Sequence, residues 1–133
     1  MLRSMISAVA VSVVLAFPAT AQETGVEEEL EMFSTAMDSL HEKAETGNAE
    51  AAFYLSSFYH VGMFVQPDRQ RAMDYLRSAA EADHPEGQYY LGLHLINGHD
   101  MDRDIERGTE LIRAAADSGH HAAQIAVDVH LGE

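Results

Sequence analysis

Three aspartates in the second half of the chain have the spacing of a calcium-binding loop. Asp100, Asp102 and Asp104 match the first, third and fifth positions of an EF-hand loop, whose carboxylates bind Ca²⁺. Two further positions do not match, because Ile105 replaces the glycine of the sharp turn and Leu111 replaces the bidentate glutamate. The pattern favours a solvated loop in which Asp102 or Asp104 caps the next helix, with adventitious cation binding as the alternative.

Histidines are the other residues that could bind a metal. The chain has 8 histidines and no cysteine, and the candidate pairs are His120 with His121 and His94 with His99. Neither pair has a zinc-ligand spacing such as His-Glu-x-x-His. Surface histidines that titrate near neutral pH are the simpler interpretation, so we predict no metal and no cofactor.

Signatures of nucleophilic catalysis are missing from the sequence. There is no Gly-x-Ser-x-Gly elbow and no cysteine nucleophile, and "GLHLING" lacks the lysine and the strand of a phosphate-binding loop. Paired carboxylates are too numerous to mark a site. We predict that the protein is not an enzyme; the alternative is a hydrolytic or metal-dependent envelope enzyme that uses His and Asp residues.

The first residues have the composition of an export signal. "MLRSMISAVAVSVVLAFPATAQ" contains a basic start at Arg3, an apolar run from Met5 to Phe17, and the small-x-small triplet that ends at Ala21. The apolar run is shorter than the roughly 20 residues that cross a bilayer. We expect a cleaved signal peptide over 1–21, a mature domain over 22–133 without a membrane anchor, and a periplasmic or secreted location.

The charge of the chain restricts its partners. The formal net charge is −14, and loss of the single base in the signal, Arg3, makes it −15. Such a surface repels nucleic-acid phosphates and anionic lipid headgroups. A protein or peptide partner with a basic patch is the expectation, and nucleic acid is excluded.

Two stretches of the chain repeat one pattern. "RSAAEADHPEGQYYLG" begins at Arg77 and "RAAADSGHHAAQIAVD" begins 36 positions later at Arg113. The same offset aligns further residues in sets: Leu40, Leu76 and Ile112; Ala44, Ala80 and Ala116; Asn48, His84 and His120; Leu55, Leu91 and Val127. Within each unit, small and apolar residues recur at the spacing of an amphipathic helix.

Each repeat is predicted to be a pair of helices. The expected helices lie near 26–45, 49–61, 68–82, 85–97, 104–118 and 121–131, with turn residues at Gly47, Gly62, Asp83, Gly98 and Gly119. One helix pair cannot bury its apolar face alone, so neighbouring pairs must stack. The predicted fold is an all-α, short α/α solenoid of about six helices, with a half repeat at 26–47, full repeats at 48–83 and 84–119, and a half repeat at 120–133.

The residues of these units resemble the Sel-1-like repeat family, which is related to the tetratricopeptide repeats. The matching first-helix residues are Gly87, Gln88, Tyr89, Leu91 and Gly92, and the matching second-helix residues are Ala72, Tyr75, Leu76, Ala79, Ala80 and Glu81. The resemblance covers roughly residues 36–131. It departs from the pattern where Ser56 and Asp128 replace a close-packing glycine and where Gly108 replaces a small alanine, which bears on local helix spacing. It implies a scaffold for protein–protein contact.

A candidate binding stripe follows from this resemblance if the first helix of each unit lines a concave face. Its residues, spaced by three and four, are Glu50, Phe53, Ser57, His60, Glu86, Tyr89, Leu93, Ile96, Ile125 and Val129. The alternative is that Phe53, Tyr89 and Ile125 belong to the core. The last helix has no second helix to cover it, so it is also expected to leave an apolar strip for a homodimer or a partner.

Overall fold

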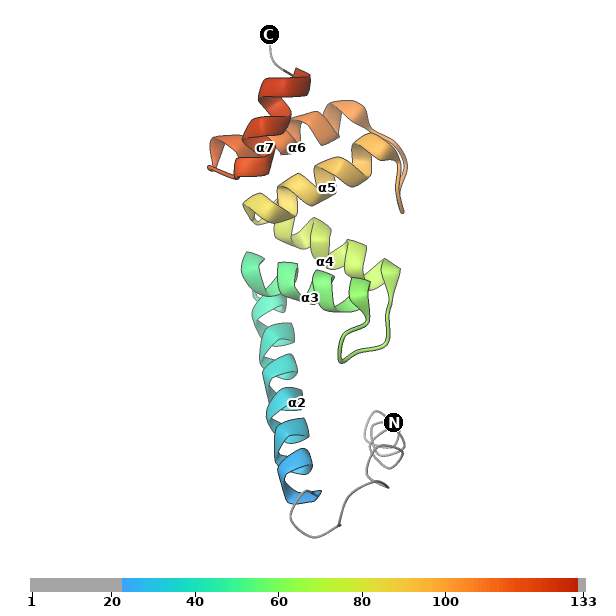
Figure 1. Ribbon diagram of the computed structural model, residues 1–133, viewed down its shortest axis with the longest axis vertical. Helices are drawn as coiled ribbons and strands as arrows, with labels where there is room; N and C mark the ends of the chain where they lie inside the picture. The colour runs from blue at the N-terminus through green and yellow to red at the C-terminus, as the bar shows by residue number, and fades with distance from the viewer. Residues whose placement is uncertain (1–22, 132–133) are drawn as a thin grey trace. The chain divides into compact units, whose positions relative to one another are not determined.

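The computed structural model describes residues 23–131, and every regular element among them is helical (Figure 1). The predicted signal peptide lies outside the described residues. The elements are α2 (Glu23–Glu45), α3 (Ala49–Val61), α4 (Arg69–Glu81), α5 (Pro85–Asn97), α6 (Ile105–Asp117), α7 (His121–Ala126) and the π-helix η2 (Val127–Leu131). The predicted all-α architecture is thereby confirmed, with six α-helices in the described chain.

The chain divides into two units within α2, after Asp38. In the first unit, α2 carries exposed Val26, Leu30 and Met32. In the second unit, which begins at Ser39, α3 packs on α4, α4 on α5, α5 on α6 and α6 on α7. Successive helices reverse direction, so α3, α5 and α7 begin at one edge of the stack (Figure 1).

The side chain just before each of the helices α3 to α7 accepts a hydrogen bond from a free N–H group of that helix. Asn48, His84 and His120 occupy equivalent positions before α3, α5 and α7, and each accepts a hydrogen bond from the backbone amide three residues later, at 2.8, 3.2 and 3.1 Å. Asp68 and Asp104 do the same for α4 and α6. The capping role predicted for the aspartate loop thus belongs to Asp104.

Left-handed residues end the helices where the repeat predicted them. Gly47, Asp83 and Gly119 have φ of 87°, 61° and 90°, and Gly62 and Gly98 have φ of 74° and 68°. This conformation is open to glycine and is tolerated by aspartate. Two further left-handed residues, Phe64 and Asp100, were not predicted, yet they too are related by the 36-residue offset.

The core lies between the stacked helices. One cluster joins α4, α5 and α6 through Met73, Leu76, Ala80, Leu91 and Leu111, and a second joins α6 and α7 through Ile112, Ala115, Ala116 and Ala123. Leu76 and Leu91 are 5 % and 6 % exposed, and Leu55 is fully buried. The repeat register derived from the sequence therefore places the expected leucines in the core.

Helices α5 and α6 approach each other closely at two glycines. A Cβ atom on Gly92 would lie 2.8 Å from the carbonyl oxygen of Gly108, and one on Gly108 would lie 2.7 Å from that of Gly92. Such distances are below normal van der Waals contact. The replacement of alanine by Gly108 thus has a structural reason, because the two backbones meet there.

The chain ends differently from the sequence prediction. A single helix was expected over 121–131, but α7 ends at Ala126 and the chain continues as the wider π-helix η2. Ala126 and Val127 still pack on the second core cluster.

Candidate functional site

The predicted binding stripe divides into buried and exposed members. Phe53, Tyr89, Leu93 and Ile96 are half-buried and pack against the core clusters, Phe53 on the first and the other three on the second. Glu50, Ser57, His60 and Glu86 are exposed. Ile125 and Val129 are 51 % and 66 % exposed. The stripe is therefore a partly accessible surface whose apolar members on α3 and α5 also contribute to packing.

Aromatic rings connect successive first helices along this surface. The Phe53 ring of α3 stacks on His84 at 4.8 Å and on Tyr90 of α5 at 6.1 Å, and it lies 6.4 Å from Tyr54, all between ring centroids. In α5, the Tyr89 ring lies 4.6 Å from the imidazole of His120, which caps α7. The rings thus link one repeat to the next.

Tyr54 and Tyr90 were missed by the sequence analysis. Each follows a stripe residue directly, and each is 47 % exposed. The sequence does contain a pattern that could have identified them, because "EAAFY" at 50–54 and "EGQYY" at 86–90 align at the 36-residue offset. They were overlooked because the stripe took the three-residue step from Glu50 and Glu86, which leads to Phe53 and Tyr89, and not the four-residue step to Tyr54 and Tyr90.

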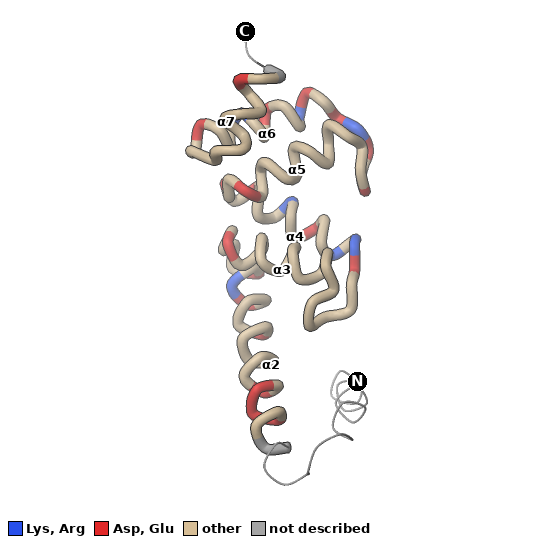
Figure 2. Tube along the Cα trace, viewed as in Figure 1, with Lys and Arg blue, Asp and Glu red and all other residues tan. Residues whose placement is uncertain are grey.

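Carboxylates lie at the start of the same helices. The Tyr54 hydroxyl donates to Oε1 of Glu50 at 3.2 Å, and this hydrogen bond, together with the charges of Glu50 and Glu86, raises the pKa of Tyr54. Glu86 lies 3.4 Å from Nδ1 of His84. Acidic residues mark the beginnings of both α3 and α5 in Figure 2, where they are favourable for the helix dipole. The aromatic surface is thus edged by negative charge.

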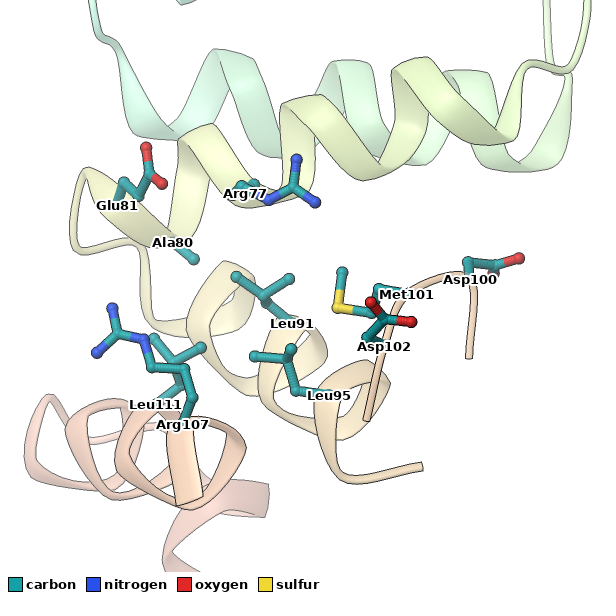
Figure 3. A pocket seen from close by; sticks show the side chains of 10 residues that line it. All are labelled: Arg77, Ala80, Glu81, Leu91, Leu95, Asp100, Met101, Asp102, Arg107 and Leu111. Atoms are coloured by element: carbon teal, nitrogen blue, oxygen red, sulfur yellow. The ribbon is translucent and has the colours of Figure 1, made fainter. Parts of the chain in front are cut away.

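A groove of about 740 Å³ lies elsewhere in the second unit. Leu91 and Leu95 of α5 project into its middle, and Arg77 of α4 and Arg107 of α6 stand on opposite sides (Figure 3). The other lining residues are Ala80, Glu81, Asp100, Met101, Asp102 and Leu111. None of the ten predicted stripe residues lines it. The groove offers an apolar floor with charges of both signs at its rim.

The comparison with known families explains the repeated geometry. The Sel1 repeat matches residues 49–84 and 85–120, which are the α3–α4 and α5–α6 pairs with their following turns. The chain belongs to the Sel1 repeat family. The matched units each begin one residue after the repeat boundaries chosen from the sequence. The resemblance stated from the residues is thereby confirmed.

Two solved structures are similar to this Sel1 repeat protein. A crystal structure of a Sel1 repeat protein from Oxalobacter formigenes has a TM-score of 0.65 and 27 % identity, over 73 % of this chain and 76 % of that one. The structure of c5321, a protective antigen of uropathogenic Escherichia coli strains with an SLR fold, has a TM-score of 0.62 and 33 % identity over 73 % of this chain. The present chain covers only 21 % of c5321. A comparison with curated proteins finds no match. The Sel1 fold is generally a protein–protein interaction module.

Among the described residues of this Sel1 protein, no three His, Asp or Glu side chains are grouped so that they could hold a metal ion. His94 and His99 interact through a hydrogen-bonding contact of 3.1 Å between Nδ1 of His94 and the His99 carbonyl. With His60, Arg69, Gly98 and Asp100, they line a hollow of about 560 Å³, where the Arg69 guanidinium binds the Asp100 carboxylate at 3.1 Å. His120, the other candidate, is a helix cap.

A second polar cluster in the Sel1 repeats surrounds Tyr59. The Tyr59 hydroxyl lies 3.1 Å from Nε2 of His41 and accepts a hydrogen bond from Arg71 at 3.3 Å, and its ring stacks on Tyr75 at 5.8 Å. Burial raises the pKa of Tyr75. Tyr59 is only 7 % exposed and lines neither hollow. Its contacts therefore tie the end of α2 to α3 and α4.

Proposed function

We propose that this Sel1 repeat protein is an exported interaction module or adaptor of the bacterial cell envelope, with no catalytic activity. It binds a protein or peptide partner on the face formed by its first helices. The observation that supports this function is the row of partly exposed aromatic rings on α3 and α5, which are large anchors of the kind that dominate interface energies. The Sel1 fold is consistent with such a role.

The proposed location rests on the N-terminal sequence. Residues 1–21 have the composition of a cleaved signal, and none of the described helices combines the length and apolar character needed to span a bilayer. The strong negative charge favours a partner with a basic patch over a nucleic acid. Fractionation of cells that express the tagged full chain tests the location, since retention in the cytoplasm at full length would contradict export.

Site-specific photocrosslinking tests partner binding. A photoreactive phenylalanine at Tyr90 places the probe on the proposed face, and the same residue at Glu110 places it on the exposed side of α6. We expect a discrete crosslinked product from position 90 in the envelope fraction and none from position 110. Equal products at both positions, or none at 90, would contradict the proposed face. Tyr90 is preferred to Tyr89, because Tyr89 also packs on the core.

Exposed apolar residues on α7 and η2 support self-association as a second binding mode. Ile125 and Val129 are exposed on α7 and η2, and exposed apolar strips favour pairing. We propose that this strip forms a homodimer. Light scattering on the mature protein should show a dimer that Val129→Glu converts to a monomer. A monomeric wild type would exclude this mode.

The rival function is a metal-dependent or hydrolytic enzyme that uses His and Asp residues. Elemental analysis of the protein after dialysis separates the two functions. Stoichiometric zinc would favour the enzyme, whereas an adaptor should retain none.

A further inference from the structure

One sequence element on the binding face occurs twice, in α3 and in α5. In "EAAFY" and "EGQYY", a glutamate precedes an exposed tyrosine by four residues, Glu50 with Tyr54 and Glu86 with Tyr90. Residues four apart lie on the same side of a helix, one turn from each other. We call the four residues the tyrosine–glutamate face. The third repeat has Ala122 and Ala126 at the equivalent positions, so the element ends with α5.

The two copies of the element form one continuous surface. Phe53 contacts both tyrosines, with centroid distances of 6.4 Å to Tyr54 and 6.1 Å to Tyr90. Within the first copy, the hydroxyl of Tyr54 bonds to Glu50 at 3.2 Å. Phe53 itself packs on the core and therefore fixes the relative positions of the two exposed rings. A ligand that contacts one copy can reach the other.

The charge of this face is not balanced by the protein's own cations. Arg69, Arg71, Arg77 and Arg107 each bind an aspartate or glutamate elsewhere. None of the described lysines or arginines forms an ion pair with Glu50 or Glu86. Among the described residues, Glu50 accepts a hydrogen bond from Tyr54, and Glu86 lies at ion-pair distance from His84. Two carboxylates beside exposed aromatic rings are thus open to an external cation.

A guanidinium group fits this combination best. The face of a tyrosine ring is electron-rich and attracts a cation within about 6 Å of its centroid. A guanidinium is planar and can stack on a ring while it donates hydrogen bonds to a carboxylate, which an ammonium group does less well. We therefore propose that the tyrosine–glutamate face binds arginine side chains of a basic segment in the partner protein, one arginine for each Glu–Tyr pair.

This inference rests on the proposed function, because it names the chemistry of the partner on the same face. The probe is a fluorescein-labelled peptide with two arginines in a glycine and serine background, titrated with the mature protein and followed by fluorescence anisotropy. The control peptide carries citrulline, which has the shape of arginine and no charge. The wild type should bind the arginine peptide and bind the citrulline peptide at least about tenfold more weakly.

Two double variants separate specific recognition from general attraction. E50Q/E86Q and E27Q/E28Q make the same change in net charge, the first on the face and the second on α2. We expect E50Q/E86Q to lose about tenfold in affinity and E27Q/E28Q to lose less than about twofold. Equal losses would show adsorption to an acidic surface and would overturn the proposal.

The rings are tested in the same way. Y54L/Y90L keeps apolar side chains but removes the aromatic faces, and it should lose about five- to tenfold, whereas Y54F/Y90F should keep most of the affinity. Unchanged binding by Y54L/Y90L overturns the role of the rings. All the substituted residues are exposed, and circular dichroism checks that each variant is folded. Failure of the wild type to bind the arginine peptide also overturns the inference, while a photocrosslink at position 90 would still support the interaction module.

Discussion

Substitution of Gly108 by alanine tests the close approach of α5 and α6. In a helix without neighbours, this change stabilises by about 0.5–1 kcal/mol, because glycine has the greater freedom in the unfolded chain. Here the new Cβ atom would lie 2.7 Å from the Gly92 carbonyl oxygen, 2.7 Å from Cγ1 of Ile96 and 3.2 Å from the Ile96 amide nitrogen. A backbone carbonyl in a helix cannot rotate away, so the two helices must separate.

Overpacking of this kind costs about 1–3 kcal/mol, which exceeds the gain in helix propensity. Gly108→Ala should therefore lower the stability by about 0.5–2 kcal/mol and the Tm by several degrees, at about 4 °C or more per kcal/mol. Thermal and urea unfolding followed by circular dichroism measure the effect. Gly25→Ala is the matched control, since nothing lies within 4 Å of its Cβ position, and it should not destabilise. A Gly108→Ala protein as stable as the wild type would show that α5 and α6 are not in contact at these glycines.

Substitutions at three further residues test the core, the caps and the Tyr59 cluster. Leu91→Ala should cost about 2–5 kcal/mol, because Leu91 is 6 % exposed in the first core cluster; an unchanged Tm would contradict the repeat register. His84→Ala should lower the free energy of unfolding by about 1 kcal/mol, because α5 loses its cap. His84→Asn should keep most of that stability, since Asn48 caps α3 in the same way. Equal losses of stability in both variants would exclude capping as the cause. Tyr59→Phe removes the hydroxyl that His41 and Arg71 contact, and should destabilise by about 1 kcal/mol in chemical denaturation; no change in the unfolding midpoint would mean that these bonds add nothing over water.

The sequence was sufficient for the fold because each repeat carries its own signals. The offset of 36 residues aligned the buried leucines, the capping residues and the left-handed turns, and α3 and α5 have the bounds expected from it. The structure of residues 121–131 was harder to predict. The apolar pattern of 121–131 is helical, but it does not distinguish i−4 from i−5 hydrogen bonding, and so it did not predict η2.

The candidate site was only partly accessible to sequence reasoning. Helical spacing placed Phe53 and Tyr89 on one face, but it could not show that both also pack on the core, because a helix face has no sharp edge between core and solvent. The exposed Tyr54 and Tyr90 follow from how α3 and α5 are rotated about their axes. The groove between Arg77 and Arg107 depends on three helices and a loop, whose relative placement no local pattern records.

The capping side chains at the helix starts affect how a repeat protein can lengthen by duplication of its repeats. Each capping side chain bonds to an amide only three residues away, so the signal that starts a helix lies wholly within one short segment. Gln88 and Gln124 add a link of eight residues, from the side-chain amide to the Ala80 and Ala116 carbonyls at the end of the preceding helix. A duplicated unit of 36 residues would therefore contain all the residues that determine where its own helices begin and end. Only the surfaces between units, such as the glycine contact of α5 with α6, would have to adapt after the duplication.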